Sequence, residues 1–389
     1  MSEIKVNSIK GVGASAAAIT VNNTDGTCTA NITNRTNKNL MVNGACLIAQ
    51  RGTSSTSTAY QTVDRFRMIT SGVDEAPTQA QADVASGTTP YTSGFRKCLK
   101  ITNGNQTSGA GSADFIKIQY RLEAQDIANS GWNYVSSSSN ITLSFWIKSS
   151  VAQNFYGYLE TSDGSAYLYP FETGSLSADT WTKITKTIPG NSNLTFDNNN
   201  EQGLQIELHP FMGTDSTASG VSLNQWNTYA AASRTPDHTS TWYTTNDATF
   251  EITGVQLEVG SVATDFEHRS FAVEKRLCMR YYQQYSNIMM VGYAPDNSNK
   301  SYSHAFTFPV EFRSPPTLTI SNTGSTAGQY VQDGQFTKTV TSLLSVACST
   351  TFAEIYFNLS GDLTNYSIAI AVSTTSTTHQ TTYYITAEL

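Results

Sequence analysis

Apolar and polar residues alternate along most of the chain, with apolar side chains at every second position between clusters of Gly, Asn, Ser and Thr. This period of two is typical of β-strands that bury one face and expose the other. The clearest runs are Ile141, Leu143, Phe145 and Ile147; Leu204, Ile206 and Leu208; Phe306, Phe308, Val310 and Phe312; and Ile368, Ile370 and Val372. The pattern predicts an all-β protein built from antiparallel sandwiches.

One predicted strand changes phase in its middle. Phe250 and Ile252 share a face, but the apolar series then continues from Val255, one position out of step. A β-bulge inserts one extra residue and absorbs such a shift. We therefore expect a bulge at Thr253–Gly254, where a glycine suits the altered backbone.

A single segment follows a helical period instead. From Phe271 to Tyr285 apolar residues recur at three-and-four spacing, with basic residues largely opposite. This spacing predicts an amphipathic helix of about four turns. Ser270 is placed to cap its N-terminus, and Glu274 lies in the first turn, where the helix dipole favours an acid.

The chain divides into four parts on these patterns. Residues 1–39 are polar and rich in Gly, Asn and Thr, with too few apolar residues to bury a core, so they are expected to lean on another chain or to stay extended. Residues 40–270 are expected to form a jelly-roll-like β-sandwich and residues 271–285 the connecting helix. Residues 286–389 are expected to form a second β-sandwich.

Two features mark the expected second sandwich. Its prolines should lie at strand ends or edges, because proline cannot donate to a sheet ladder; they are Pro309, Pro315 and Pro316. The low-complexity stretch from Ser373 to Thr382 is polar and β-branched. It could form a solvent-facing hairpin or a fibre-like strand.

Charge and hydropathy narrow the possible partners. Among 389 residues, 23 Lys and Arg stand against 30 Asp and Glu, which gives a net charge of -7. No basic face is large enough to neutralise many phosphates, so nucleic acid is not an expected partner. The sequence holds no apolar run of about 18 residues and no secretory leader, so we expect neither membrane insertion nor export.

No pattern of catalytic or metal-ligating residues stands out. The five Cys are odd in number and lack CxxC spacing, which favours small buried thiols over disulfides or a zinc site. There is no GxSxG elbow and no HExxH pair. Glycoside hydrolysis needs two carboxyl groups close together in space, and spacing along the sequence does not show which carboxyl groups meet in a β protein. The nominal candidates for such a pair are Glu123, Asp126, Glu207, Glu258 and Glu267. Strand-end charges or arginine partners explain them more simply, so we expect no enzyme, no cofactor and no metal.

Aromatic residues within polar loops are the remaining chemical signal. Trp132 and Tyr134 lie in one such stretch, and Trp242 and Tyr243 lie in another. An exposed ring stacks on the apolar face of a sugar while nearby Asn, Asp or Gln side chains bind its hydroxyls. These four residues are candidate glycan ligands. The alternative is that their rings pack over the sandwich edges or fill a subunit interface.

Motifs between Leu40 and Tyr285 occur in a recognisable order. They are Asn43–Gly44, Ile48–Arg51, Val63–Met68, Gln119–Glu123, Leu143–Lys148, Thr187–Gly190, Leu223–Trp226, Gly254–Arg269 and Arg280–Tyr282. This ordered set resembles a segment that recurs in tail fibre and appendage proteins of tailed bacteriophages, those of marine and cyanobacterial phages above all. Asp265 stands where similar proteins tend to carry proline, and residues 286–389 lie outside the resemblance.

The resemblance implies a jelly roll like those of carbohydrate-binding modules, carried in a homotrimeric virion appendage. It also implies a structural role for three tryptophans at shared positions, Trp146, Trp181 and Trp226. Within the shared Phe-Glu-His-Arg segment, it implies that Glu267 and Arg269 form a buried or half-buried pair that anchors the sandwich to the helix.

The leading hypothesis is therefore a structural virion protein, a trimeric tail fibre made in the host cytoplasm and released by lysis. Residues 1–39 would dock to other tail or baseplate proteins, and the sandwich loops would contact host polysaccharide or lipopolysaccharide, with avidity from several copies. Two alternatives stay open. One is a capsid decoration or tail adaptor without a receptor role, and the other is a polysaccharide-degrading tailspike.

Overall fold

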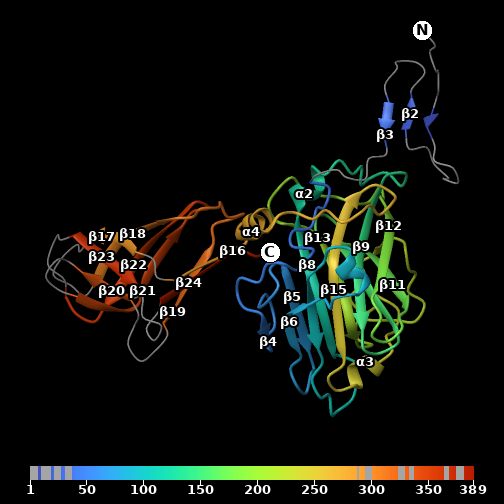
Figure 1. The fold of residues 1–389 in the computed structure, drawn as a ribbon, viewed down its shortest axis with the longest axis horizontal. Helices are drawn as coiled ribbons and strands as arrows, with labels where there is room; N and C mark the ends of the chain where they lie inside the picture. The colour runs from blue at the N-terminus through green and yellow to red at the C-terminus, as the bar shows by residue number, and fades with distance from the viewer. Residues whose placement is uncertain are drawn as a thin grey trace, which may run out of the picture.

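The computed structural model describes residues 8–9, 19–21, 28–30, 37–286, 289–293, 300–322, 329–332, 337–362, 368–373 and 381–389. Within these ranges the protein is built almost entirely of antiparallel β-sheets, which confirms the all-β class. A large two-layered unit and a smaller C-terminal unit lie on either side of helix α4 (Figure 1).

Two six-stranded sheets packed face to face form the larger unit, which we call the jelly roll. The first sheet has the strand order β14-β11-β10-β13-β8-β5, and the second has the order β12-β9-β15-β7-β6-β4. The first sheet comprises β5 (Phe66–Ser71), β8 (Phe115–Glu123), β10 (Asn154–Thr161), β11 (Tyr167–Ser175), β13 (Gln202–Met212) and β14 (Asn227–Thr228). The second comprises β4 (Ser54–Ser55), β6 (Thr78–Asp83), β7 (Lys97–Thr102), β9 (Asn140–Ser149), β12 (Thr182–Pro189) and β15 (Thr249–Val259). Short helices α1 (Thr89–Thr92), α2 (Ala124–Ala128) and α3 (Thr241–Thr244) lie in the connections.

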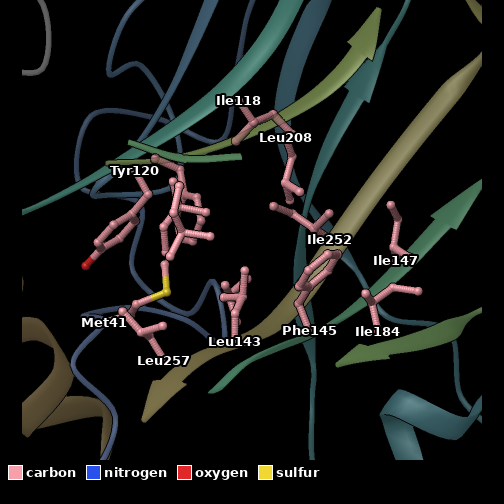
Figure 2. Packing of buried hydrophobic residues seen from close by; sticks show 14 of the residues in the cluster. Met41, Ile118, Tyr120, Leu143, Phe145, Ile147, Ile184, Leu208, Ile252 and Leu257 are labelled. Carbon is pink, nitrogen blue, oxygen red and sulfur yellow. The ribbon is translucent and has the colours of Figure 1, made fainter. Parts of the chain in front are cut away.

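The jelly-roll core lies between the two sheets and follows the predicted alternation. Ile141, Leu143, Phe145 and Ile147 of β9 are all 0% exposed. Figure 2 shows Leu143, Phe145 and Ile147 in the same cluster as Ile118 and Leu208 of the first sheet. Each fully buried side chain of this kind stabilises the fold by roughly 1.5–3 kcal/mol relative to exposure. The intervening residues of each strand therefore face outward.

The predicted bulge is present in β15. Its pairing with β9 shifts register between Thr253 and Gln256. Gly254 has a φ of 63°, a left-handed conformation that glycine adopts without steric cost. The extra residue lets both halves of the strand keep their apolar side chains in the core.

Helix α4 (Phe271–Met279) begins where expected but ends about six residues earlier. The Ser270 side chain accepts a hydrogen bond from the Val273 N–H at 3.4 Å, which confirms the predicted cap. The chain then forms strand β16 (Tyr282–Ser286), in which Tyr282 pairs with Thr386 of β24. Tyrosines suit a strand, and pairing with a distant segment overrides the helical spacing of this region.

The C-terminal unit combines a three-stranded sheet with a closed barrel, where two packed open sheets were expected. The sheet contains β16, β24 (Thr381–Thr386) and β19 (Thr317–Asn322). The barrel contains β17 (Met289–Tyr293), β18 (Lys300–Thr307), β22 (Phe352–Leu359), β21 (Thr337–Cys348), β20 (Gln329–Gln332) and β23 (Ile368–Ser373). The three prolines lie between β18 and β19, as predicted, so that Phe308 and Phe312 are buried from a loop rather than from a strand. Most of the low-complexity stretch, residues 374–380, lies outside the described residues.

The N-terminal part contains a small sheet of three strands, β1 (Ser8–Ile9), β2 (Ile19–Val21) and β3 (Cys28–Ala30). Ile9 is 53% exposed. The rest of residues 1–36 lies outside the described residues. Strands of two and three residues are too short to enclose a core of their own.

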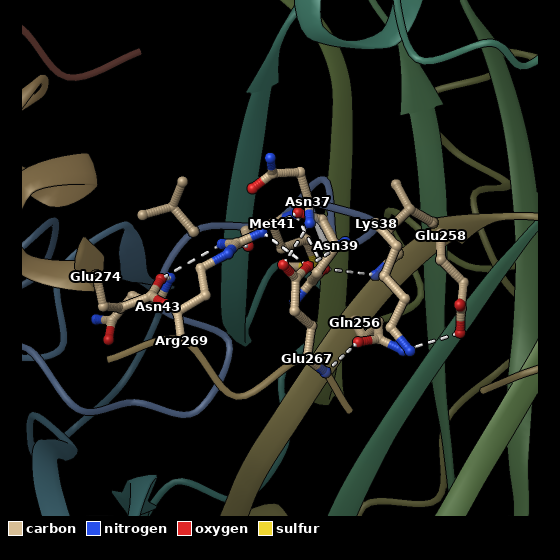
Figure 3. A network of polar contacts seen from close by, with 12 residues as sticks. Asn37, Lys38, Asn39, Met41, Asn43, Gln256, Glu258, Glu267, Arg269 and Glu274 are labelled. Carbon is tan, nitrogen blue, oxygen red and sulfur yellow. Dashed lines mark hydrogen bonds and ion pairs between the residues drawn. The ribbon is translucent and has the colours of Figure 1, made fainter. Parts of the chain in front are cut away.

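Residues 37–43 are held to the end of the jelly roll by a network of polar contacts (Figure 3). Glu267 accepts a hydrogen bond from the Asn39 backbone N–H at 2.8 Å and pairs with Arg269 at 3.3 Å. Arg269 lies 3.7 Å from Glu274 of α4, and Glu274 accepts a hydrogen bond from the Asn43 N–H. The predicted Glu267–Arg269 pair is thus confirmed, and it links the sandwich both to the helix and to the start of the jelly roll.

Buried charges join the jelly roll to the C-terminal unit. Arg65, whose side chain is 1% exposed, pairs with Glu388 and stacks 3.4 Å from the centre of the Tyr281 ring. Glu123, fully buried at the end of β8, accepts two hydrogen bonds of 2.8 Å from Arg280. A buried guanidinium needs its carboxylate partner, because leaving either charge unpaired is costly.

Replacing Glu388 with Gln should destabilise the protein by about 3–5 kcal/mol, because the buried Arg65 charge would lose its counter-ion. Urea unfolding of the full chain measures this change. The control, Glu201→Gln, alters an exposed carboxylate and should change stability by less than about 0.5 kcal/mol. Equal unfolding midpoints for the two variants would contradict the role given to this pair.

Candidate functional site

The rings of Trp242 and Tyr243 are not available to a ligand. Both side chains are 0% exposed and belong to the jelly-roll core. The Trp242 indole N–H donates to the Thr249 carbonyl at 2.9 Å, and the Tyr243 hydroxyl donates to Asp114 at 3.1 Å. Helix α3 turns both rings inward, so the packing alternative holds for this pair and the expectation of exposed loop aromatics is wrong here.

Trp132 and Tyr134 lie in the loop between α2 and β9, at the opposite end of the jelly roll from α3 (Figure 1). Trp132 is 3% exposed, and its indole N–H donates to the Ser139 carbonyl at 3.2 Å. Tyr134 is half-buried and meets Phe196 edge to face, with ring centres 5.0 Å apart. The structure thus does not bring the four candidate aromatics together, and it leaves only Tyr134 partly accessible.

The outer face of the first sheet carries a row of polar side chains centred on Glu207. Strand register places Gln119 and Tyr158 on either side of Glu207, which is 0% exposed. Its two oxygens accept hydrogen bonds from five side chains: Lys117 (2.9 Å), Gln119 (2.5 Å), Gln205 (2.8 Å), His209 (3.1 Å) and Tyr158. A carboxylate so fully occupied cross-links the three strands β8, β10 and β13 and is not available as a general acid.

The same cluster shifts several pKa values. Burial alone would raise the pKa of Glu207, but the hydrogen bond from His209 and the charge of Lys117 lower it well below its usual range. Burial lowers the pKa of His209. Burial and the neighbouring His209 lower the pKa of His238, whose ring centre lies 5.8 Å from that of His209. Both imidazoles are therefore neutral at neutral pH.

A cavity of about 340 Å³ lies on the outer face of the second sheet. Ser144 and Trp146 of β9 line it, and register places Lys183 of β12 directly opposite Trp146. The β15 bulge contributes Gly254, where an added Cβ would lie 2.6 Å from the Phe95 ring. The bulge that preserves the core thus also shapes this cavity.

The segment that follows β15 supplies the opposite wall. Its Phe266 and His268 rings pack against Phe95, with ring centres 4.9 and 5.0 Å from that of Phe95. His268 is exposed, and its Nε2 atom donates to the Ser93 carbonyl at 3.0 Å. Trp146 and Phe266 are half-buried, so part of each ring remains accessible.

A neutral, a positively charged and a negatively charged side chain surround these rings. Ser144 offers a hydroxyl, Lys183 an ammonium and Asp265 a carboxylate. Within the part of the chain that the structure describes, neither Lys183 nor Asp265 has an ion-pair partner. An aromatic platform ringed by convergent donors and acceptors is typical of a small-ligand site. We call this cavity, defined by Trp146, Phe266, His268, Lys183 and Asp265, the tryptophan pocket.

Sequence reasoning missed this pocket because the family resemblance favoured a structural role for Trp146. The signal was nevertheless present in β9. Trp146 lies between the inward-facing Phe145 and Ile147, so simple alternation places it on the outer face. What alternation could not reveal is that residues 265–268 fold back over the same face.

The clustering of titratable side chains and the length of the helices bear on metal binding and on membrane insertion. Among the described residues, no group of three or more His, Cys, Asp or Glu side chains is arranged to hold a metal ion. The described helices include none that is both long and apolar enough to cross a bilayer. The described thiols of Cys46, Cys98 and Cys278 are free and buried.

No protein-family model matches the chain, and no curated protein matches it. Among solved structures it is similar to a candidate sugar-binding protein from Bacteroides thetaiotaomicron, with a TM-score of 0.30, 10% identity and coverage of 57% of this chain and 100% of that one. It is also similar to the N-terminal cellulose-binding domain of Cellulomonas fimi β-1,4-glucanase C, with a TM-score of 0.26, 8% identity and coverage of 56% of this chain and 99% of that one. A third similar structure is the family 11 carbohydrate-binding module of Clostridium thermocellum, with a TM-score of 0.24, 11% identity and coverage of 56% of this chain and 98% of that one. Because these scores lie below 0.5, the assignment of this chain's architecture rests on its own two packed sheets.

Stability should fall with acid in two steps. The pKa values of His209 and His238 lie below the ordinary 6.5 in the folded protein. Below about pH 6.5 the unfolded chain therefore binds more protons than the folded protein, and the free energy of unfolding falls. The pKa of Glu207 lies below its ordinary 4.5, so a second loss begins below about pH 4.5. Urea midpoints measured from about pH 7.5 down to 4 test both steps.

The variant His209→Gln keeps a donor for Glu207 and should reduce the first step, because one of the two buried imidazoles is removed. A midpoint that stays constant between about pH 7.5 and 5.5 in the unmodified protein would rule out this account of the buried histidines.

Proposed function

We propose that this chain is a non-catalytic glycan-binding protein and that the tryptophan pocket is its sugar site. The observation that carries the proposal is the half-buried Trp146 ring within a cavity whose rim holds Ser144, Lys183 and Asp265. A pyranose presents one apolar face of C–H groups and a rim of hydroxyls, which this arrangement complements.

The charges of the pocket favour a neutral sugar. Lys183 donates and Asp265 accepts, so together they bind hydroxyls without leaving a net charge to attract an ion. Asp265 is also the single carboxylate lining the pocket. Glycoside hydrolysis ordinarily uses two carboxyl groups, so the lining supports binding rather than cleavage.

We further propose that the chain is a trimeric appendage of a virus particle. This step rests on the ordered motifs between Leu40 and Tyr285 and on the small sheet of β1, β2 and β3. Because strands this short enclose no core, neighbouring copies or a docking partner would supply the missing contacts. Residues 1–39 would attach to tail or baseplate proteins, and several tryptophan pockets on one particle would bind host polysaccharide with avidity.

Trp146→Ala should weaken binding to neutral oligosaccharides about tenfold or more, because the stacking platform is lost. Binding of the full chain to an array of neutral host-type glycans, followed by calorimetry on the best ligand, measures the change. Trp181→Ala is the matched control, because Trp181 lies on the same outer face beside Lys148 but outside the pocket. Equal affinity for Trp146→Ala and the unmodified chain would disprove the site.

Light scattering of the purified chain should give the mass of three copies, and removal of residues 1–39 should prevent incorporation into particles. Cryo-electron microscopy of particles should then place the protein on the tail. A single copy at micromolar concentration would contradict the trimer. Density on the capsid faces would favour the decoration alternative.

A further inference from the structure

A second concave surface lies where the jelly roll meets the C-terminal sheet. It has a volume of about 440 Å³ and is lined by Tyr60, Tyr282, Tyr384 and Arg51. Tyr60 precedes β5 of the jelly roll, whereas Tyr282 and Tyr384 come from β16 and β24. We call it the tyrosine groove. Both units contribute rings to it, so it exists only when they are joined.

Arginines gather around the jelly-roll side of this groove. The guanidinium of Arg51 lies 5.7 Å from the centre of the Tyr60 ring, and that of Arg67 lies 5.6 Å from the same centre. Arg67 pairs in register with Gln119 of β8. Arg121 follows two residues after Gln119 and therefore faces the same side of the first sheet.

These arginines differ in how far their charges are compensated. Arg51 pairs with Glu388 at 3.1 Å and lies 3.9 Å from Asp64. By contrast, Arg67 and Arg121 form no ion pair among the residues that the structure describes. The buried Nε atom of Arg67 has no hydrogen-bond acceptor in that part of the chain.

Glu207 and Glu160, whose charges act on Arg121, are already engaged. Glu207 is saturated by its five donors, and Glu160 accepts a hydrogen bond from Gln205 at 3.2 Å. Arg121 donates its Nε–H to Gln205 at 3.2 Å. Burial and the charge of Arg67 lower the pKa of Arg121, as expected for two neighbouring cations that repel each other.

We propose that this junction is a second saccharide site, specific for an acidic sugar whose oxyanion lies between Arg67 and Arg121 and whose ring lies against Tyr60. Guanidinium groups present planar pairs of N–H donors that match carboxylate and phosphate oxygens. The adjoining tyrosine groove offers rings on which further sugar residues of the same glycan stack. This site goes beyond the neutral-sugar pocket, since it lies on the other sheet and takes a different ligand class.

Three soluble probes separate the possibilities. The full chain should bind trigalacturonic acid, an oligosaccharide with carboxylates, at least tenfold more tightly than neutral maltotriose. Its affinity should fall as sodium chloride is raised, because the contacts are ionic. Inorganic phosphate should compete only weakly if the sugar rings contribute, and full competition by phosphate at equal concentration would show a simple anion site and overturn the saccharide assignment.

The variant R67Q/R121Q should lose at least tenfold in affinity for trigalacturonic acid, whereas R67K/R121K should keep part of it because the charges remain. R276Q removes an exposed positive charge on α4 and should have no effect. Circular dichroism and urea midpoints establish that each variant is folded. If R67Q/R121Q is unfolded, the lysine variant and the salt dependence of the unmodified chain decide the question.

Unchanged affinity in R67Q/R121Q, or an equal loss in R276Q, would overturn the proposal. Trp146→Ala should leave trigalacturonic acid binding intact, so failure of the neutral-sugar pocket and failure of this site are distinguishable. A parallel loss in Trp146→Ala would show that the two surfaces are not separate sites.

Discussion

The burial of two apolar sheet faces against each other is the constraint on which the rest of the jelly roll depends. Because side chains alternate along a strand, filling the space between the sheets fixes which residues point outward. Phe145 and Ile147 point into the core, so Trp146 between them points to the outer face. The polar side chains that could contact a ligand therefore lie on the outer faces of the sheets. Glu207, Arg67 and Arg121 lie on the first sheet, and the tryptophan pocket lies on the second.

The bulge in β15 shows how one backbone feature affects both the core and the tryptophan pocket. Without the extra residue, the second half of the strand would turn its apolar side chains to solvent, as a one-residue slip reverses every side chain beyond it. At the bulge, Gly254 leaves room for the Phe95 ring, against which the wall of the pocket packs. A side chain at position 254 would therefore disturb both the ring and the pocket.

Charge plays the corresponding role between the two units. Arg65 and Glu123 are buried in the jelly roll, and each finds its partner in residues that follow it in the chain, Glu388 and Arg280. Charges of this kind are costly when separated, which favours a single relative placement of the two units. The tyrosine groove depends on that placement.

Much of this architecture could be predicted from local pattern, and the failures have a common origin. The alternation of β9, the β15 bulge and the Ser270 cap are encoded by neighbouring residues, and all three are present. The early end of α4 depends on pairing with β24, about a hundred residues away in sequence, which periodicity does not register. The inward turn of Trp242 likewise depends on distant partners, since its carbonyl accepts a hydrogen bond from Asn103 and its indole N–H donates to Thr249. The closed barrel depends on strand order. Alternation encodes neither.

The central claim is that a sugar binds through the outer face of β9, at Trp146. A crystal structure of the full chain with the neutral oligosaccharide selected on the array tests it most directly. The account predicts a pyranose ring stacked on the Trp146 indole, with hydroxyls within hydrogen-bond reach of Lys183 and Asp265. A sugar bound elsewhere on the protein, with the tryptophan pocket unaltered, would contradict it.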